Sequence, residues 1–184
     1  MTSRTQWIVV GGVVAALGVA LFVATRTFGD DLFHVAPGSR APDFHATTMV
    51  PGSKAMKNIS DYRGQVVLLN MWATWCGPCK QEMPGIQALH ESLGPSGLHI
   101  VALSVDEPDM DDAIRAFVAE HKLTFEVLHE GSGTIERDYQ TSGVPETFLI
   151  GKDGVIRKRV IGAAEWNSEG NVRLIRGLLA EEAP

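Results

Sequence analysis

Hydrophobic and polar positions divide the chain into one long apolar segment and a series of shorter runs separated by turns. Residues 7–24 form an unbroken apolar run of 18 residues, the length at which a helix begins to span a hydrocarbon layer of about 30 Å. From residue 39 onward, short apolar runs alternate with glycine- and proline-containing turns. The pattern predicts one transmembrane helix at 7–24 and one globular domain at 39–184.

The runs of the globular part predict an α/β order of elements. A continuous apolar run at 65–71 is typical of a strand buried on both faces. A helical pattern at 76–93 and a second apolar run at 99–105 follow it, so the two strands should be parallel. Other strands are predicted at 44–48, 125–128, 147–150 and 155–160, and other helices at 109–121, 134–139 and 168–180. The sequence therefore predicts a central mixed sheet flanked by helices.

Hydrophobic spacing also predicts the face that each helix buries. Pro84 lies inside the first helix, where it removes one backbone hydrogen bond and should kink the helix. The acidic start of the helix at 109–121 suits the positive end of its dipole. The side chains expected in the core are Met83, Ile86, Leu89, Leu93, Ile114, Phe117, Val118, Val172, Ile175, Leu178 and Leu179.

The N-terminal run has two interpretations, an uncleaved anchor and a cleaved signal peptide. The anchor is favoured because the run exceeds the about 7 to 15 apolar residues of a signal core, and no convincing cleavage site closes it. Arg4 precedes the run, whereas Arg26 after it is followed by two aspartates, so the positive-inside rule places residues 1–6 in the cytoplasm. Residues 25–38 are then a polar tether. The domain is expected outside the cytoplasm, held by a single pass through the cytoplasmic membrane.

Charge and cysteine content narrow the function. The net charge is −6, and because residues 1–28 hold two of the 16 basic side chains and none of the 22 acidic ones, the rest is strongly acidic. Such a surface argues against nucleic acid as a partner. The chain has two cysteines, both just after the strand at 65–71. Because the chain has no second pair of cysteines, the domain has no structural disulfide to stabilise it, even in an oxidising compartment. Its stability must come from its hydrophobic core.

Cys76 and Cys79, spaced as C-x-x-C where a strand gives way to a helix, suit reversible disulfide exchange. Free N–H groups and the dipole at a helix N-terminus favour a thiolate, which makes Cys76 the nucleophile. Cys79 lies about one turn further on and becomes the resolving thiol. Pro78 falls in the first turn, where a missing N–H costs nothing, and Gly77 leaves the nucleophile uncrowded. Trp75 is expected on the exposed rim of this site.

The sequence supports two other interpretations of the cysteine pair, a zinc site and a structural disulfide, less well than it supports redox chemistry. A structural zinc site needs two more ligands, yet no further cysteine or spaced histidine pair exists. A structural disulfide closing so short a loop restricts the unfolded chain little. Redox chemistry is therefore the preferred interpretation, with no metal and with no cofactor beyond the cysteine pair itself.

Three motifs in order carry a resemblance to a known family. They are APDF at 41–44, VVLLNMWATWCGPCKQEMP at 66–84 and GVPETFLI at 143–150. WCGPCK after an apolar strand looks like the thioredoxin active site. The longer set resembles the membrane-anchored thiol:disulfide oxidoreductases of the TlpA, ResA and CcmG (DsbE) type over nearly all of residues 39–184. The resemblance implies a thioredoxin-like fold with an N-terminal extension and a helix-strand insertion at 109–128.

The resemblance also implies roles around the cysteines. The Val144–Pro145 bond should be cis and lie against them, with the Val144 backbone pairing an incoming polypeptide, although Pro145 could instead merely begin an edge strand. Glu82 should lie near the pair, where a carboxylate raises thiol pKa values and carries a proton, unless it is an ordinary solvated helix residue. Glu146 resembles the CcmG pattern and is expected to contribute to partner choice. Asn70 stands where thioredoxin has a carboxylate, so protons must be handled elsewhere.

Together these expectations describe a reductant of protein disulfides outside the cytoplasm. The resemblance points to cytochrome c maturation, with apocytochrome c among the substrates and a membrane-embedded electron donor of the DsbD or CcdA type. Alternatives with the same chemistry are a reductant for copper-site assembly and a general periplasmic thiol oxidoreductase. A copper chaperone of the Sco type wants CxxxC and a ligand histidine that cannot be placed here. A peroxiredoxin needs T-x-x-C, which the cysteine region lacks.

Overall fold

The computed structural model describes residues 3–32 and 35–183, which divide between two compact units, Met1–His34 and Val35–Pro184. The first unit is the helix α1 (Ser3–Leu32). Its window Gln6–Val23 has a mean hydropathy of 2.2, and none of that window is buried in the structure. By length and composition, α1 is therefore able to cross a membrane.

Helix α1 is longer than the apolar run that predicts it. The sequence predicts an irregular tether at 25–38, but the helix continues to Leu32, so the first half of that tether is helical. No proline interrupts the chain before Pro37, and each residue added to an existing helix gains a backbone hydrogen bond. Residues 33 and 34 of the predicted tether lie outside the described residues.

The domain also begins earlier than the predicted residue 39. Val35 is 1% exposed and belongs to the domain core. The N–H of Gly38 donates to the carbonyl of Ile156 at 2.8 Å, and Ala41 donates to Gly154 at 2.9 Å. The last residues of the predicted tether therefore run along a strand of the domain, held by backbone hydrogen bonds.

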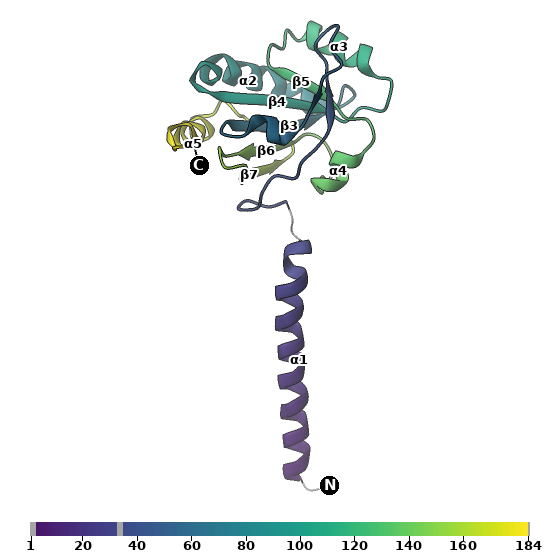
Figure 1. Ribbon diagram of the computed structural model, residues 1–184, viewed down its shortest axis with the longest axis vertical. Coiled ribbons are helices and arrows are strands. Elements are labelled where there is room, and N and C mark those ends of the chain that lie inside the picture. The colour runs from purple at the N-terminus through teal and green to yellow at the C-terminus, as the bar shows by residue number, and fades with distance from the viewer. Residues whose placement is uncertain (1–2, 33–34, 184) are drawn as a thin grey trace. The chain divides into compact units, whose positions relative to one another are not determined.

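The second unit is built on a seven-stranded mixed sheet in the order β2-β1-β5-β4-β3-β6-β7 (Figure 1). The strands are β1 (Ala46–Thr48), β2 (Met56–Lys57), β3 (Val66–Trp72), β4 (Leu98–Ser104), β5 (Glu126–His129), β6 (Glu146–Ile150) and β7 (Ile156–Ile161). The central strand β3 is parallel to β4 and antiparallel to β6. All seven residues of β3 are buried, which confirms the prediction from its continuous apolar run.

Helices cover both faces of this sheet. They are α2 (Gly77–Leu93), α3 (Asp111–Glu120), α4 (Thr134–Asp138) and α5 (Glu169–Ala180), with short 3-10 turns η1 (Ile59–Tyr62) and η2 (Gly94–Ser96). Buried side chains of α2, α3 and α5 pack on the β3 face that contains Leu68 and Trp72. The opposite face, with Leu69 and Met71, packs against α4 and the start of the domain. Because successive strand residues point to opposite faces, β3 contributes to both cores.

Most predicted elements are confirmed, and the differences are local. The strand β2 was not predicted, because two residues are too few to show an alternating pattern. Val118, Val172 and Leu179 are only partly buried, since they lie at the margins of helix faces whose centres are the fully buried Ile114 and Ile175.

The topology brings three segments to one edge of the sheet. The ends of the parallel strands β3 and β4 lie side by side, with Trp72 paired to Ser104. The antiparallel strand β6 begins at the same edge, where Glu146 pairs with Met71. The cysteine loop after β3, the turn after β4 and the segment before β6 therefore meet there.

Candidate active site

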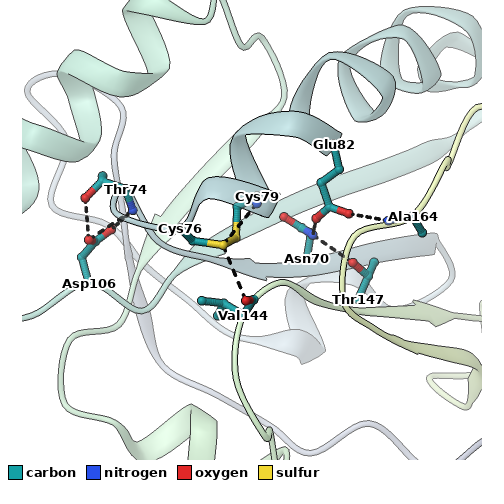
Figure 2. The surroundings of a disulfide bond; sticks show 9 residues. All are labelled: Asn70, Thr74, Cys76, Cys79, Glu82, Asp106, Val144, Thr147 and Ala164. Carbon is teal, nitrogen blue, oxygen red and sulfur yellow. Dashed lines mark hydrogen bonds between the residues drawn. A yellow bond between two sulfur atoms is a disulfide. The ribbon is translucent and has the colours of Figure 1, made fainter.

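Cys76 and Cys79 form a disulfide at the N-terminus of α2 (Figure 2). Cys76 is the N-cap residue, and its sulfur accepts a hydrogen bond from the Cys79 N–H at 3.2 Å. Free backbone donors and the helix dipole favour negative charge at this position, so Cys76 is the better thiolate after reduction. Cys79 is completely buried, whereas Cys76 retains 3% exposure. The exposed residues Trp75 and Gly77 flank Cys76 in the chain, so Cys76 is the cysteine nearer the surface.

An exposed rim surrounds the Cys76 sulfur. It contains Trp75, Gly77 and Pro78, with Trp75 69% exposed. The carbonyl oxygen of Val144 lies 3.5 Å from Cys76 Sγ. The Val144–Pro145 bond is cis, as the resemblance implied. Trp75, Gly77 and Pro78 thus adjoin Cys76 in the chain and Val144 contacts its sulfur, and the role of these four residues in binding substrate stays a prediction.

Glu82 lies inside the domain rather than in solvent. It is 5% exposed, its Oε1 accepts a hydrogen bond from Asn70 Nδ2 at 2.7 Å, and its Oε2 accepts one from the Ala164 N–H at 3.1 Å. Asn70 also donates to Thr147 Oγ1 at 2.9 Å, so one amide connects α2, β3 and β6 (Figure 2). The alternative of an ordinary solvated helix residue is therefore wrong for Glu82.

Burial raises the pKa of the Glu82 carboxyl above its usual range, and the hydrogen bonds from Ala164 and Asn70 lower it in part. Such a carboxyl takes up and releases its proton closer to neutral pH than an exposed glutamate does. Asn70 cannot accept a proton itself, but its two hydrogen bonds fix the Glu82 carboxyl close to the disulfide (Figure 2). Glu82 is thus placed to serve as the proton carrier that Asn70 cannot be.

Glu146 does not reach the rim. Its side chain is completely buried, forms an ion pair with Arg159, and accepts a hydrogen bond from the Ser142 N–H at 3.3 Å. Arg159 in turn donates to the carbonyls of Val35 and Gln140, each at 2.7 Å. This burial contradicts a direct contact between Glu146 and a partner. Glu146 instead joins β6, β7 and the segments next to the cis bond.

The sequence did not single out Thr74 and Asp106, which the structure joins beside the disulfide (Figure 2). The Thr74 N–H donates to Asp106 Oδ2 at 2.9 Å, and the Thr74 hydroxyl donates to Oδ1 at 2.7 Å. One signal was available: Asp106 closely follows a predicted strand that is parallel to the strand before the cysteines. Side chains at the ends of neighbouring parallel strands meet at one edge of a sheet.

Metal ligands do not gather within residues 3–32 and 35–183, where no three His, Cys, Asp or Glu side chains lie close enough to hold an ion. The acidic start of α3 is engaged in ion pairs instead. Asp111 Oδ1 lies 2.7 Å from His129 Nδ1, and Arg115 pairs with Asp112 at 2.9 Å and with Asp111 at 3.3 Å.

Comparison with known proteins connects this geometry to a family. The chain matches the AhpC/TSA family over residues 37–159. The chain belongs to the AhpC/TSA family. Among the relatives of this AhpC/TSA protein is the thiol-disulfide oxidoreductase ResA of Geobacillus kaustophilus, which is 34% identical over 149 residues, or 81% of each chain.

Solved structures confirm the thioredoxin-like fold of this AhpC/TSA family member. A thiol:disulfide interchange protein DsbE from Chlorobium tepidum superposes with a TM-score of 0.70 and 29% identity, over 79% of this chain and 99% of that one. A protein disulfide isomerase from Bacteroides thetaiotaomicron has a TM-score of 0.66 and 26% identity, over 80% and 92% of the two chains. The similarity to these relatives and the Cys76–Cys79 pair together identify the protein as a thiol:disulfide oxidoreductase.

Proposed function

We propose that this AhpC/TSA family member is an extracytoplasmic reductant of protein disulfides that serves cytochrome c maturation. The observation that carries the proposal is the placement of the Cys76 sulfur, which lies at a helix N-terminus, 3.5 Å from the Val144 carbonyl oxygen, in the residue that follows the exposed Trp75. Cys79 lies buried behind it, within disulfide distance. The cytochrome pathway is supported by the resemblance to CcmG-type proteins carried by the GVPETFLI motif.

The reaction follows from the two cysteines. The thiolate of reduced Cys76 attacks one sulfur of a partner disulfide, which forms a mixed disulfide and releases one partner thiolate. The thiolate of Cys79 then attacks Cys76 Sγ, which closes the Cys76–Cys79 disulfide and releases the second partner thiolate. Two electrons pass to the partner, and the proton that Cys79 loses is taken up by Glu82. The structure corresponds to the oxidised end of this cycle.

The N-terminal helix supports the proposed location. The apolar window of α1 is long enough to span a bilayer, and Arg4 precedes it, so the domain belongs on the extracytoplasmic side of the cytoplasmic membrane. An anchored reductant on that side must regain two electrons for each turnover. We therefore include a membrane-embedded electron donor of the DsbD or CcdA type among its partners. No cofactor beyond the cysteine pair is required by this cycle.

Substrate trapping tests the proposal. Cys79→Ser removes the resolving thiol, so mixed disulfides between Cys76 and its partners should accumulate in the host. The matched control is Cys76→Ser with Cys79→Ser, which retains the fold but has no nucleophile. Partners bound to the first variant and absent from the control are identified after reduction. Apocytochrome c or its haem-handling partners among them is the expected result.

Other outcomes would move the protein to another role. A copper-site protein without any cytochrome would assign the reductant to copper-site assembly, and a broad set of secreted proteins would make it a general thiol oxidoreductase. Both results would overturn the cytochrome assignment. A reduction potential of about −120 mV, rather than about −270 mV, would overturn the reducing direction itself.

A further inference from the structure

A carboxylate lies beneath the loop between β3 and α2. Asp106 is 1% exposed and is surrounded by hydrogen-bond donors. Besides the two bonds from Thr74, it accepts one from the Ser104 hydroxyl at 2.7 Å (Figure 2 shows the Thr74 bonds). The three hydrogen bonds fix the position of the buried carboxylate. Breaking any of them would leave a buried polar atom without a hydrogen-bond partner, which costs free energy.

The loop that Asp106 holds leads directly to the reactive sulfur. Thr74 precedes Cys76 by two residues, and the Cys76 N–H donates to the carbonyl of Ala73 at 3.1 Å. Two peptide units span about 7 Å at most, so the Cα atom of Cys76 lies within about 7 Å of the Cα atom of Thr74, the residue that contacts the carboxylate. Figure 2 shows Asp106, which follows β4, on the side of the disulfide away from Glu82. Charges interact more strongly in a partly buried site than in bulk water, because the effective dielectric constant is lower there.

The helix-strand insertion braces Asp106 from the other side. His129 Nε2 lies 3.0 Å from the main-chain oxygen of Asp106, and His129 Nδ1 lies 2.7 Å from Asp111 Oδ1. A Cβ at Gly131 would lie 2.9 Å from the backbone nitrogen of Pro108, so the chain packs tightly here. Of the titratable groups near this cluster, His129 from β5 contacts Asp106 and Asp111 from α3 contacts His129. The neighbouring Glu130 donates its N–H to the Ser104 carbonyl, while its carboxylate accepts hydrogen bonds from Ser132 and Ile135.

We propose that Asp106 is a positioning residue that fixes the Thr74–Cys76 loop and places a negative charge against the Cys76 thiolate. The proposal deepens the proposed function and rests on it. The helix dipole stabilises the thiolate, and the Asp106 charge opposes that stabilisation. Strong stabilisation of the thiolate would stabilise the reduced form and make the protein an oxidant. By opposing the helix dipole, the Asp106 charge limits this stabilisation, as a reductant requires.

The test measures the pH profile of Cys76 alkylation by iodoacetamide in the reduced full chain, with the modified residue identified by mass spectrometry. Asp106→Asn keeps the size of the side chain and removes its charge. We expect the midpoint of the profile to move to lower pH, with alkylation about threefold to tenfold faster below the midpoint. Asp112→Asn is the matched control, since its side chain is fully exposed on α3, and it should leave the profile unchanged.

A second variant acts in the opposite direction and guards against misfolding of the first. Ser104→Ala removes one donor but leaves the Asp106 charge, which then opposes the thiolate more strongly, so alkylation should be slower below the midpoint. Unchanged profiles for both variants, or for Ser104→Ala alone if Asp106→Asn does not fold, would overturn the proposal. Its failure is separable from failure of the proposed function, which would appear as a wild-type protein unable to reduce partner disulfides.

Discussion

At the residue scale, the buried carboxyl of Glu82 links proton binding to stability. Burial raises its pKa in the folded chain, so the folded state binds this proton more tightly than the unfolded state does. The stabilisation from the bound proton is complete below the unfolded pKa of 4.5 and is lost as the pH rises through the folded pKa. Each unit by which the pKa is raised corresponds to about 1.4 kcal/mol.

Glu82→Gln should therefore change the pH dependence of unfolding. The oxidised wild-type domain should lose free energy of unfolding relative to the variant as the pH rises above 4.5. A separate, pH-independent loss of about 1 to 3 kcal/mol is expected in the variant, because its amide cannot accept hydrogen bonds from both Asn70 and Ala164 with both of its polar atoms. Urea titrations at several pH values measure both effects.

Glu120→Gln provides the baseline for that experiment, because Glu120 is an exposed residue at the end of α3. A difference between wild type and Glu82→Gln that stays constant from acid to alkaline pH would contradict a raised pKa for Glu82. The oxidised form is used throughout, so that the cysteines do not titrate.

Residues of the site differ in how far the sequence predicts them. Cys76 and Cys79 follow from spacing and from the strand-helix junction alone, and the cis Val144–Pro145 bond follows from the resemblance. Helical spacing places Glu82 on the buried face of α2 with Met83 and Ile86, but its hydrogen bond from Ala164, which lies 82 residues away in the chain, could not be predicted. Local periodicity carries no information about a contact of that range.

At the element scale, the same contrast separates strands from loops. The central strand β3 and the helix α2 were predictable because long, strongly patterned segments determine their own secondary structure. The continuation of α1 to Leu32 and the short strand β2 were not, since neither has a hydrophobic pattern of its own. The position of Asp106 depends on the parallel register of β3 and β4, which a single sequence does not specify.

The antiparallel pair β6–β7 contains a buried ion pair whose loss can be measured. Arg159 is largely buried against the fully buried Glu146, and it also donates to two carbonyls outside these strands. Arg159→Met should lower the free energy of unfolding by about 3 to 5 kcal/mol, because it leaves the Glu146 carboxylate buried without its partner. Urea unfolding of the purified protein measures this change.

The double variant Arg159→Met with Glu146→Gln identifies the cause. If the uncompensated charge dominates, removing it should recover a large part of the stability that the single variant loses. Equal stability of the single and double variants would show instead that the hydrogen bonds of Arg159 to the carbonyls of Val35 and Gln140 are what matters.

At the scale of the whole molecule, the chain combines an apolar helix with a domain that has its own core. The domain core contains residues from Val35 onward, and its backbone hydrogen bonds to β7 begin at Gly38. The predicted boundary at residue 39 would therefore cut through the domain, whereas the structure divides the chain after residue 34. The fold class was predictable from the order of elements. The boundary was not, because it depends on the burial of the single residue Val35, which no hydrophobic pattern indicates.

Two truncated chains distinguish these boundaries. Residues 35–184 should fold, bind no membrane, and keep the thiol exchange of Cys76 and Cys79, because every core contact of the domain remains. Residues 39–184 should be less stable by at least about 2 kcal/mol, since the chain loses the burial of Val35 and the backbone bond of Gly38 to Ile156. Urea unfolding, membrane fractionation and a disulfide-reduction assay of both chains check these results. Equal stability of the two chains would show that residues 35–38 are a tether, as predicted, whereas a chain 35–184 that does not fold would show that the domain depends on α1.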